Sequence, residues 1–308
     1  MYIIIINPVA GNGRANRFYK KLIKNEDLQH ISFQTYYTEY EGHAEKIILE
    51  LLNKFSPTEI KAIIVFGGDG TMNEVLNGVN VFGIPVSFIP GGSGNDFARG
   101  VPLDKNPNKI LHNIISKDKK TSYSLGQYYL KSEKEIRKFI NCIGFGFDAV
   151  VAKSANESKL KKILNKIKLG KISYLFELIK QLFFYKPITI TIEMDGKSKT
   201  FHRCLLMTIN NQPYFGGGMK INPLAKNNDE HFSVLVVDSI SKWKVLFLFG
   251  TVFTGKHINF KEVHTFNTSA VKVTSKEMIP FQVDGETGMT KSCYVEKHES
   301  PIQVLGVS

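Results

Sequence analysis

The sequence contains few cysteines, and their spacing suits neither disulfides nor metal. Its 308 residues include only three, Cys142, Cys204 and Cys293, which lie far apart in apolar, strand-like segments. Because three is an odd number and no pair has metal-ligand spacing, we expect buried free thiols in a reducing cytoplasm. The eight histidines likewise lack zinc-ligand spacing. These patterns argue against a disulfide-stabilised secreted domain and against a zinc protein.

Long hydrophobic runs are also missing. The most apolar later stretches, 172–185 and 243–253, are shorter than the about 20 residues that a membrane-spanning helix needs. The first of them also carries Glu177 and Lys180. The chain opens with a short apolar strand at 2–6, without the basic flank of a secretion signal. We therefore expect a soluble, cytoplasmic protein.

Negative charge is in the minority. The chain carries 40 lysines and arginines against 28 acidic residues, which gives a net charge of +12. A basic surface suits nucleic acid, an anionic membrane or an acidic small molecule, and net charge alone does not select among them. The sequence has neither zinc-finger spacing nor an aromatic RNA-binding motif, so we expect no nucleic-acid partner.

The first third of the chain repeats one pattern of strand, glycine-rich turn and helix. The three turns follow apolar runs and lie at 7–13, 67–70 and 90–96. Alternating strands and helices predict an α/β domain with a doubly wound parallel sheet. Because ligands bind beyond the carboxyl ends of such strands, we expect all three turns at one sheet edge. Thr38, which ends a further predicted strand, should lie on the same edge.

The central turn, 67–70, has the chemistry of a phosphate site. Its three glycines surround Asp69, so backbone N–H groups can approach a phosphate without interference from Cβ atoms. We predict that Thr71 caps the helix that follows and that Asp69 faces Mg²⁺ carried by a nucleotide. A glycine-rich turn with a surface aspartate is the alternative for this motif alone. The chain has no P-loop motif and no complete dinucleotide fingerprint.

Strand signals dominate after residue 122. We predict a β-rich domain, sandwich- or barrel-like, over residues 122–297. A helical insertion is expected at 153–185, and the last segment, 298–308, is expected to return to the first domain, 1–121. The predicted strand 122–130 opens the second domain.

Two polar turns in this half could carry chemistry. Asp284 and Glu286 follow a predicted strand and suit a general base and a Mg²⁺ partner near a nucleotide, with a solvated hairpin turn as the alternative. In the loop 226–231, Asp229 could hold a cation through oxygen ligands. A polar loop that closes a hairpin explains that segment equally well.

The helical insertion is cationic. Its apolar residues from Leu160 to Ile167 follow helical spacing, and its lysines lie mostly off that stripe: Lys159, Lys161, Lys162, Lys166, Lys168 and Lys171. A basic amphipathic helix beside an aromatic-rich one is typical of docking on an anionic membrane. A core helix with a solvated face is the alternative.

Six motifs spread over essentially the whole chain carry a family resemblance. They are Asn7-Pro8-x-x-Gly11, Gly67-Gly68-Asp69-Gly70-Thr71-x-Asn73-Glu74, Gly91-Gly92-Ser93-Gly94-Asn95-Asp96-Phe97-Ala98-Arg99, Asn141-x-x-Gly144-Phe145-Gly146, Gly216-Gly217-Gly218-Met219 and Val283-Asp284-Gly285-Glu286. Together they resemble the diacylglycerol kinase catalytic family, the soluble bacterial lipid kinases related to sphingosine kinases. The second motif is shared with NAD kinases, whereas the third combined with the last is more specific.

The resemblance implies a nucleotide-binding α/β domain and a C-terminal β-sandwich of NAD kinase type, with the active site between them and with ATP and Mg²⁺ as cofactors. It implies ATP contacts at Asn7, Pro8, Val9, Ala10, Gly11, Thr38, Gly68, Asp69, Gly70, Thr71, Met72, Asn73, Glu74, Ser93 and Asp96. It places the proton acceptor at Glu286 with Asp284 beside it, and Asp69 and Asp96 in a Mg²⁺–carboxylate network.

The resemblance further implies a structural Mg²⁺ held by Asp229 and by the main-chain carbonyls of Lys226 and His231. It also places Arg14 and Lys166 among cations that meet lipid phosphates. The chain departs from the family at two positions of the metal loop: Glu230 stands where glycine is frequent, and Ser233 where a further aspartate is frequent. Both departures weaken the metal assignment more than the ATP assignment.

We therefore predict an ATP- and Mg²⁺-dependent kinase that phosphorylates a lipid hydroxyl, with conversion of diacylglycerol to phosphatidic acid as the first choice. Such an enzyme would associate peripherally with an anionic membrane. The alternatives are a kinase of a sphingoid or phosphatidylglycerol-type lipid, a soluble-substrate kinase of NAD kinase type, and a non-catalytic lipid-binding regulatory protein. The sequence leaves the oligomeric state open, a homodimer included.

Overall fold

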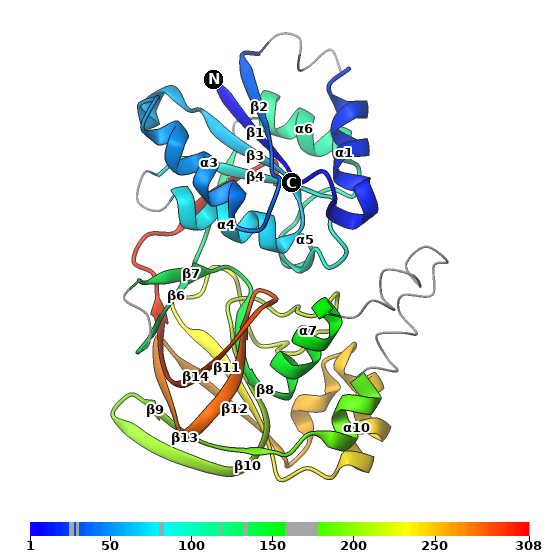
Figure 1. The fold of residues 1–308 in the computed structure, drawn as a ribbon, viewed down its shortest axis with the longest axis vertical. Helices are drawn as coiled ribbons and strands as arrows, with labels where there is room; N and C mark the ends of the chain where they lie inside the picture. The colour runs from blue at the N-terminus through cyan, green and yellow to red at the C-terminus, as the bar shows by residue number, and fades with distance from the viewer. Residues whose placement is uncertain are drawn as a thin grey trace. The chain divides into compact units, whose positions relative to one another are not determined.

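The protein forms two compact units, and each is described by itself. A computed structural model describes residues 1–24, 28, 31–79, 83–117, 119–131, 135–157 and 178–307. One unit comprises Met1–Leu125 with His298–Ser308, and the other Gly126–Lys297 (Figure 1). The first unit therefore extends four residues beyond the predicted boundary, because residues 120–123 pair with its sheet.

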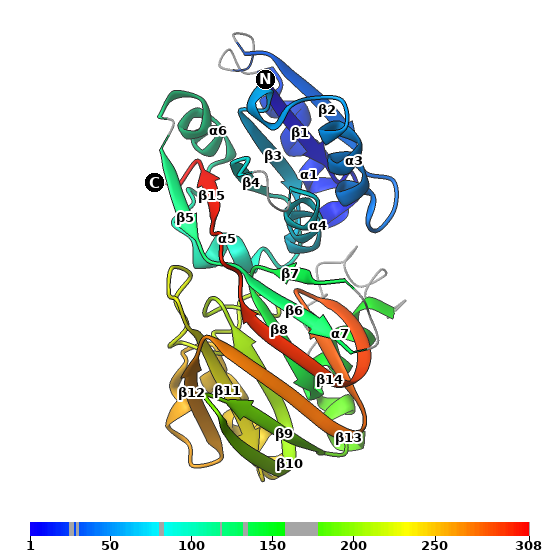
Figure 2. The same cartoon turned by 90° about the vertical axis from the view of Figure 1, so that its left-hand side faces the viewer.

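The first unit is built on a six-stranded sheet. Its order is β2 (Phe33–Tyr37), β1 (Tyr2–Ile6), β3 (Ala62–Gly67), β4 (Val86–Pro90), β15 (Ile302–Leu305) and β5 (Lys120–Tyr123). All neighbours are parallel except β15 and β5, which pair antiparallel (Figure 2). The predicted doubly wound parallel sheet is confirmed, and the last strand returns to it.

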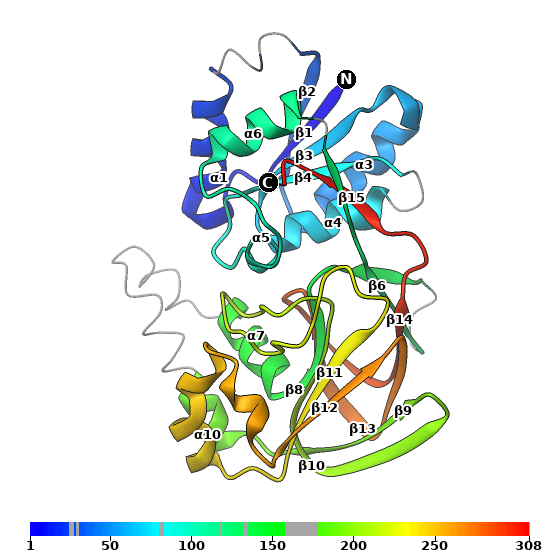
Figure 3. The ribbon, with the colours of Figure 1, turned by 180° about the vertical axis from the view of Figure 1, so that it is seen from behind.

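Helices cover both faces of this sheet. On one face lie α1 (Ala10–Leu22) and α6 (Pro107–Ser116), and on the other α3 (His43–Leu52) and α4 (Asp69–Val79) (Figures 1 and 3). The described residues of the unit also form two short helices, η1 (Pro57–Glu59) and α5 (Asp96–Gly100). Because both faces are covered, β1 and β3 are buried at every position, which explains their uninterrupted apolar sequences.

The second unit is a curled antiparallel sheet of nine strands. The order is β12-β11-β10-β8-β13-β14-β6-β7, with β9 paired to β10 and β13. Its strands are β6 (Gly126–Leu130), β7 (Arg137–Phe139), β8 (Cys142–Gly146), β9 (Ile188–Met194), β10 (Lys197–Asn210), β11 (Phe232–Asp238), β12 (Val263–Thr268), β13 (Ala270–Val283) and β14 (Glu286–Lys297). Phe139 on β7 and Phe232 on β11 stack at 5.7 Å although they lie near opposite ends of this order. The sheet thus closes over one core, as expected for a β-rich domain.

A helical group flanks this sheet. It consists of α7 (Phe147–Glu157), α10 (Lys242–Leu248), η2 (Phe249–Val252) and η3 (Lys256–Asn259), and helix also covers residues 178–184. The basic segment Lys159–Lys171, Lys166 included, lies outside the described residues. No helix in the part of the chain that the structure describes is long and apolar enough to cross a membrane.

Two details differ from or add to the sequence analysis. The predicted strand 122–130 is wrong as a single element: Ser124 and Leu125 separate β5 from β6, and these strands belong to different sheets. The reason is that the chain crosses from one unit to the other at this point. The three cysteines are buried and free, as their apolar surroundings predicted.

Candidate functional site

The three glycine-rich turns of the first unit meet at the carboxyl edge of its sheet. We call the residues 7–13, 67–70 and 90–96 the glycine rim. Asn7 Nδ2 donates to Thr71 Oγ1 over 3.1 Å, and the Gly91 and Gly92 N–H groups both donate to the Gly67 carbonyl over 2.8 Å. The predicted convergence of the turns is therefore confirmed.

Backbones approach so closely in the rim that only glycine fits. A Cβ atom on Gly92 would lie 2.5 Å from the Cα of Gly68, and one on Gly11 would collide with the Gly91 carbonyl oxygen. The φ of Gly11 is 58°, which a side chain rarely adopts. Arg14 Nε donates to the same Gly91 carbonyl over 3.2 Å, and its guanidinium also donates to the Gly92 carbonyl. Arg14 thus ties the first turn to the third.

The structure corrects the prediction for Thr71. Helix α4 begins at Asp69, and the Gly68 carbonyl accepts the Met72 N–H over 3.1 Å, so Thr71 lies inside the helix rather than capping it. The helix can begin so early because Gly67 carries no Cβ, which would lie 2.7 Å from the Thr71 Cβ. Thr71 is buried and serves as the acceptor for Asn7.

Several other residues predicted to contact ATP are buried or hydrogen-bonded within the unit. Met72 and Asn73 are buried in α4, and Glu74 Oε2 accepts the Ala44 N–H over 3.0 Å at the start of α3. Thr38 is buried too, and its N–H donates to the Ile6 carbonyl over 2.9 Å.

The exposed positions of the rim lie at its first and third turns. Val9 is 78% exposed, and Ser93 is exposed at the third turn. Pro8, Ala10, Gly68 and Gly70 are partly accessible. Accessible residues are thus present at all three turns of the rim.

Asp69 holds the third turn in place. Its Oδ2 and Oδ1 accept the N–H groups of Asp96 and Phe97 over 2.9 and 3.0 Å, at the start of α5. Asp96 Oδ1 also pairs with the Arg99 guanidinium at 3.0 Å. Burial of the Asp69 carboxyl and the charge of Asp96 raise the pKa of Asp69 to about 6, although its backbone hydrogen bonds and Arg99 oppose the rise. A divalent cation would relieve this repulsion, and contact of Mg²⁺ with Asp69 and Asp96 stays a prediction.

In the second unit, Asp284 and Glu286 share one hairpin but have different surroundings. Asp284 and Gly285 form the two-residue turn between β13 and β14 with φ values of 48° and 101°, as in the tight turns that favour Asp-Gly. The Asp284 carboxylate accepts three backbone N–H groups, from Ile140 at 2.8 Å and from Asn141 and Cys142 at 3.0 Å. Asp284 therefore anchors the segment between β7 and β8, whereas Glu286 opens β14 and is half-buried.

A buried polar chain leads from this hairpin to α7. The Gly285 N–H donates to Gln282 Oε1 over 3.0 Å, and Gln282 Nε2 donates to Asp148 Oδ2 over 3.3 Å. Asp148 lies in the first turn of α7, and its burial raises its pKa to about 7. The sequence analysis missed both Gln282 and Asp148. The available signal was a polar residue interrupting an apolar run in each case.

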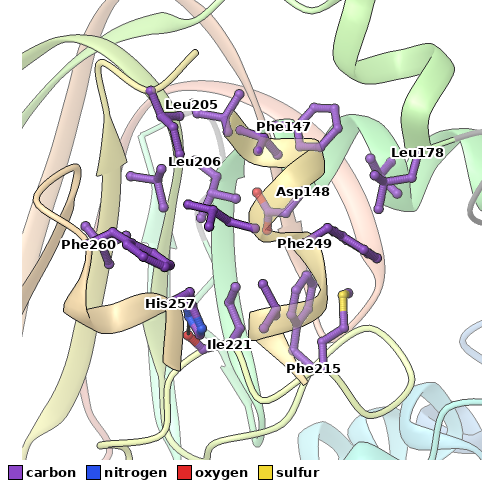
Figure 4. Close-up of a pocket in the computed structure, with 18 residues that line it drawn as sticks. Phe147, Asp148, Leu178, Leu205, Leu206, Phe215, Ile221, Phe249, His257 and Phe260 are labelled. Atoms are coloured by element: carbon purple, nitrogen blue, oxygen red, sulfur yellow. Dashed lines mark hydrogen bonds between the residues drawn. The ribbon is translucent and has the colours of Figure 1, made fainter. Parts of the chain in front are cut away.

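Asp148 also lines a cavity of about 110 Å³ that lies entirely within the second unit (Figure 4). Apolar side chains form nearly all of its wall, including Phe147, Leu178, Leu205, Ile221, Phe249 and Phe260. The other ionisable group in the wall is His257, whose Nε2 donates to the Ile221 carbonyl over 2.7 Å. Burial lowers the pKa of His257, so its ring is neutral.

The predicted metal loop forms a turn closed by its own hydrogen bonds. The Asp229 N–H donates to the Lys226 carbonyl over 3.2 Å, and the His231 N–H donates to Asp229 Oδ1 over 3.1 Å. The Asp229 charge also acts on the half-buried ammonium of Lys297, which weighs against a second cation there. Within the described ranges, no three His, Cys, Asp or Glu side chains gather as a metal site. A structural Mg²⁺ at Asp229 stays a prediction with little support from its donor set.

Comparisons with known proteins agree with this architecture. Residues 1–127 match the diacylglycerol kinase catalytic domain, and residues 141–305 match the YegS C-terminal NAD kinase beta sandwich-like domain. The chain is 32% identical over 307 residues to "Putative lipid kinase YtlR" of Bacillus subtilis (strain 168), covering 98% of both chains. It is 28% identical over 304 residues to "Diacylglycerol kinase" of Mycobacterium tuberculosis (strain ATCC 25618 / H37Rv), covering 98% of this chain and 93% of that protein.

A solved structure shares the fold. The crystal structure of "a putative diacylglycerol kinase from Bacillus anthracis str. Sterne" superposes with a TM-score of 0.74 at 22% identity, covering 99% of this chain and 96% of that one. Matched domain models over most of the chain and a full-length relative above 30% identity agree with one another. The chain belongs to the diacylglycerol kinase family of lipid kinases.

Proposed function

We propose that this protein transfers the γ-phosphate of ATP to the hydroxyl of a membrane lipid, with diacylglycerol as the first candidate and phosphatidic acid as its product. The observation that carries the proposal is the glycine rim, where three turns from three parallel strands meet with their backbones in contact. Family membership supports a kinase, and the chain's own residues suggest how each substrate is held.

The rim suits the triphosphate of ATP. It follows the carboxyl ends of β1 and β3 at the switch point of the sheet, because β1 is flanked by β2 on one side and β3 on the other. Backbone N–H groups at the start of α4 and at Gly11 and Asn12 in the left-handed stretch after β1 suit phosphate oxygens. When bound, Mg²⁺ would neutralise charge on the transferred phosphoryl group, with Asp69 and Asp96 as its ligands.

Glu286 is our proposed proton acceptor for the lipid hydroxyl. It is a half-buried carboxylate at a strand end, and the adjoining turn is fixed by the three hydrogen bonds of Asp284. A positioned general base accelerates such a step by roughly 10²–10⁴-fold. In this account Asp284 positions Glu286 and does not itself take the proton.

The apolar cavity of the second unit is our proposed site for the lipid chain. Cavities that bind small apolar molecules are mostly lined by hydrophobic side chains with a few placed polar groups. The wall formed by α7, β10, β11 and the helical group around α10 has this composition (Figure 4). NAD, the substrate of the related soluble kinases, is highly polar and would gain little from such a wall.

We also propose that the protein docks on an anionic membrane through an aromatic surface beside this cavity. The aromatic surface consists of the exposed rings of Phe183, Phe184, Trp243, Phe247 and Phe253. Trp243 and Phe247, four residues apart on α10, are 73% and 88% exposed, and Phe183 contacts Trp243 at 5.3 Å between ring centroids.

The opposite side of α10 supports the same proposal. Val245 and Leu248 line the cavity, so the helix is apolar toward both the cavity and the exterior. Exposed lysines adjoin the aromatic surface in sequence, among them Lys186 and Lys256. Each lysine near an anionic bilayer contributes about 1 kcal/mol. A lipid chain could thus pass between the bilayer and the cavity along one helix.

Phosphate transfer tests the proposal. The protein is incubated with γ-labelled ATP, Mg²⁺ and mixed micelles that contain diacylglycerol, a sphingoid base or phosphatidylglycerol, and in a parallel reaction with NAD. We expect label in a lipid product only. Label in NAD would favour the soluble-substrate kinase, and ATP that stays intact with every acceptor would favour a non-catalytic lipid-binding protein.

A further inference from the structure

Two stacked rings lie accessible just beyond the carboxyl end of β2. The ring centroids of Tyr40 and His43 are 4.4 Å apart, and the two ring planes differ by 8°. Tyr40 is 54% exposed, and among the residues that the structure describes, His43 is the ring that contacts it. His43 therefore covers one face of the Tyr40 ring and leaves the opposite face to a ligand.

Hydrogen bonds hold the stacked pair in place. The Glu39 N–H donates to His43 Nδ1 over 3.0 Å, and the His43 N–H donates to the Tyr40 carbonyl over 3.3 Å. Gly42 lies between the two residues in sequence and has a φ of 82°, which lets the chain turn into α3. Because the rings are already oriented, a ligand that stacks on Tyr40 loses little of its binding energy to ordering the protein.

The stacked pair adjoins the glycine rim through two connections. The Thr38 N–H donates to the Ile6 carbonyl, one residue before the rim begins, and Tyr40 follows Thr38 by two residues. Glu74 Oε2 accepts the Ala44 N–H, which joins the first turn of α3 to α4, the helix that begins in the second turn of the rim. The pair thus lies at the same sheet edge as the first and second turns.

We propose that Tyr40 is the surface on which the base of ATP stacks while the glycine rim holds the triphosphate. None of the rim residues, 7–13, 67–70 and 90–96, is aromatic, so the base requires a surface outside the rim. A base and an aromatic side chain stack because both present flat π-faces. The inference rests on the proposed ATP-dependent function and assigns a residue to the part of the nucleotide that the rim does not hold.

The charges around the pair also suit a base. Glu39 and Glu41 flank Tyr40 in sequence, and both are exposed. Two carboxylates disfavour a phosphate or an anionic lipid headgroup at this position, since like charges repel. Adenine is uncharged, and its exocyclic amino group is a hydrogen-bond donor that a carboxylate can accept. The pair therefore fits the base end of the nucleotide and not its phosphate end.

Two ligands separate the base from the phosphates. Calorimetry compares Mg·ATP with magnesium tripolyphosphate, which has no base. Tyr40→Ala should bind ATP about 10-fold more weakly than wild type and should bind tripolyphosphate with unchanged affinity. Tyr40→Phe keeps the ring and should bind ATP within about twofold of wild type. Gly92→Ala, which displaces the third turn of the rim, should instead weaken the binding of both ligands.

A fluorescent nucleotide gives a readout that does not depend on affinity. The emission of 1,N6-etheno-ATP is quenched when its base stacks on an aromatic ring. At saturation, we expect quenching in wild type and in Tyr40→Phe, and emission close to that of the free nucleotide in Tyr40→Ala. The matched control is Tyr129→Ala, at a 42% exposed tyrosine of the second unit, which should behave as wild type.

The two proposals can fail separately. Equal ATP affinity of wild type and Tyr40→Ala would overturn the role of Tyr40 and leave the kinase function in place if lipid still gains phosphate. Equal losses for ATP and tripolyphosphate in Tyr40→Ala would show that the ring pair only supports the loop, which also overturns it. Wild-type protein that binds no ATP would refute both proposals.

Discussion

The glycine rim and the apolar cavity are built from different parts of the chain. In the rim, side chains such as Asn7, Asp69 and Thr71 bond to one another or to the backbone and fix the turns in place. In the cavity, the wall is made of side chains, among them the two ionisable residues Asp148 and His257. Backbone recognition suits a triphosphate, which is the same in every ATP, whereas side-chain recognition can be tuned to one lipid. The predictions below test this division, from the largest expected effect to the smallest.

Glu286→Gln should lower phosphate transfer by roughly 10²–10⁴-fold, because the amide cannot accept the proton of the lipid hydroxyl. ATP affinity, measured by calorimetry, should stay within about twofold of wild type, since the change lies outside the rim. Substantial turnover in this variant would show that Glu286 is not the general base.

Asp284→Ala should destabilise the second unit by about 3 kcal/mol, because three backbone N–H groups at Ile140–Cys142 lose their acceptor. Urea unfolding followed by the single tryptophan, Trp243, reports on that unit. An unchanged unfolding midpoint together with a complete loss of transfer would instead make Asp284 a catalytic group.

The raised pKa of Asp69 predicts a pH-dependent stability. The folded state keeps this proton up to about pH 6, whereas the unfolded chain loses it near pH 4, so the Asp69 contribution to stability falls as pH rises through that window. The decrease should be on the order of 2 kcal/mol. In Asp69→Asn this pH-dependent decrease in stability should be absent. The variant also loses one hydrogen bond, which should lower its stability by the same amount at every pH.

The measurement is chemical unfolding between pH 4 and 8. A difference between Asp69→Asn and wild type that stays constant with pH would show that the folded-state pKa is not raised.

Gly92→Ala should lower ATP affinity by about 10-fold, because the new Cβ would lie 2.5 Å from the Gly68 Cα and displace the third turn. Lipid binding to the cavity should be unaffected. Gly250→Ala is the matched control, since nothing lies within 4 Å of a Cβ there. If wild type, Gly92→Ala and Gly250→Ala bind ATP with equal affinity, the rim does not bind the nucleotide.

Replacing both Trp243 and Phe247 by serine should weaken binding to phosphatidylglycerol-containing vesicles by about 10-fold, because two large apolar side chains no longer enter the interface. Sedimentation with vesicles measures this. Leu49→Ser, at a 49% exposed apolar position on α3, serves as the control. If the double variant instead changes only the oligomeric state, the aromatic surface is a protein interface.

The rim could be predicted from sequence because its chemistry requires glycine at fixed places. Close approach at Gly92 and left-handed backbone at Gly11 leave a visible mark in the sequence, and parallel topology brings the turns to one edge. The sequence contains no comparable signal for the directions in which side chains point. Thr71 was expected to cap a helix that in fact starts at Asp69. Met72 and Asn73 are buried, and their contact with ATP stays a prediction.

The cavity could not be predicted because its wall comes from segments far apart in the chain, from Phe147 to Val263. Each segment alone reads as ordinary core. Asp148 was detectable in principle as an acidic residue two positions after an apolar strand, but its hydrogen bond joins it to Gln282, which lies more than a hundred residues later.

Amide hydrogen exchange with and without Mg·ATP tests the central claim, that backbone groups of the glycine rim hold the nucleotide. We predict that ATP slows exchange at residues 11–13, 68–70 and 91–95, with little change around the cavity of the second unit. Protection confined to the second unit, or no protection in the rim under conditions where ATP binding is saturated, would contradict the account.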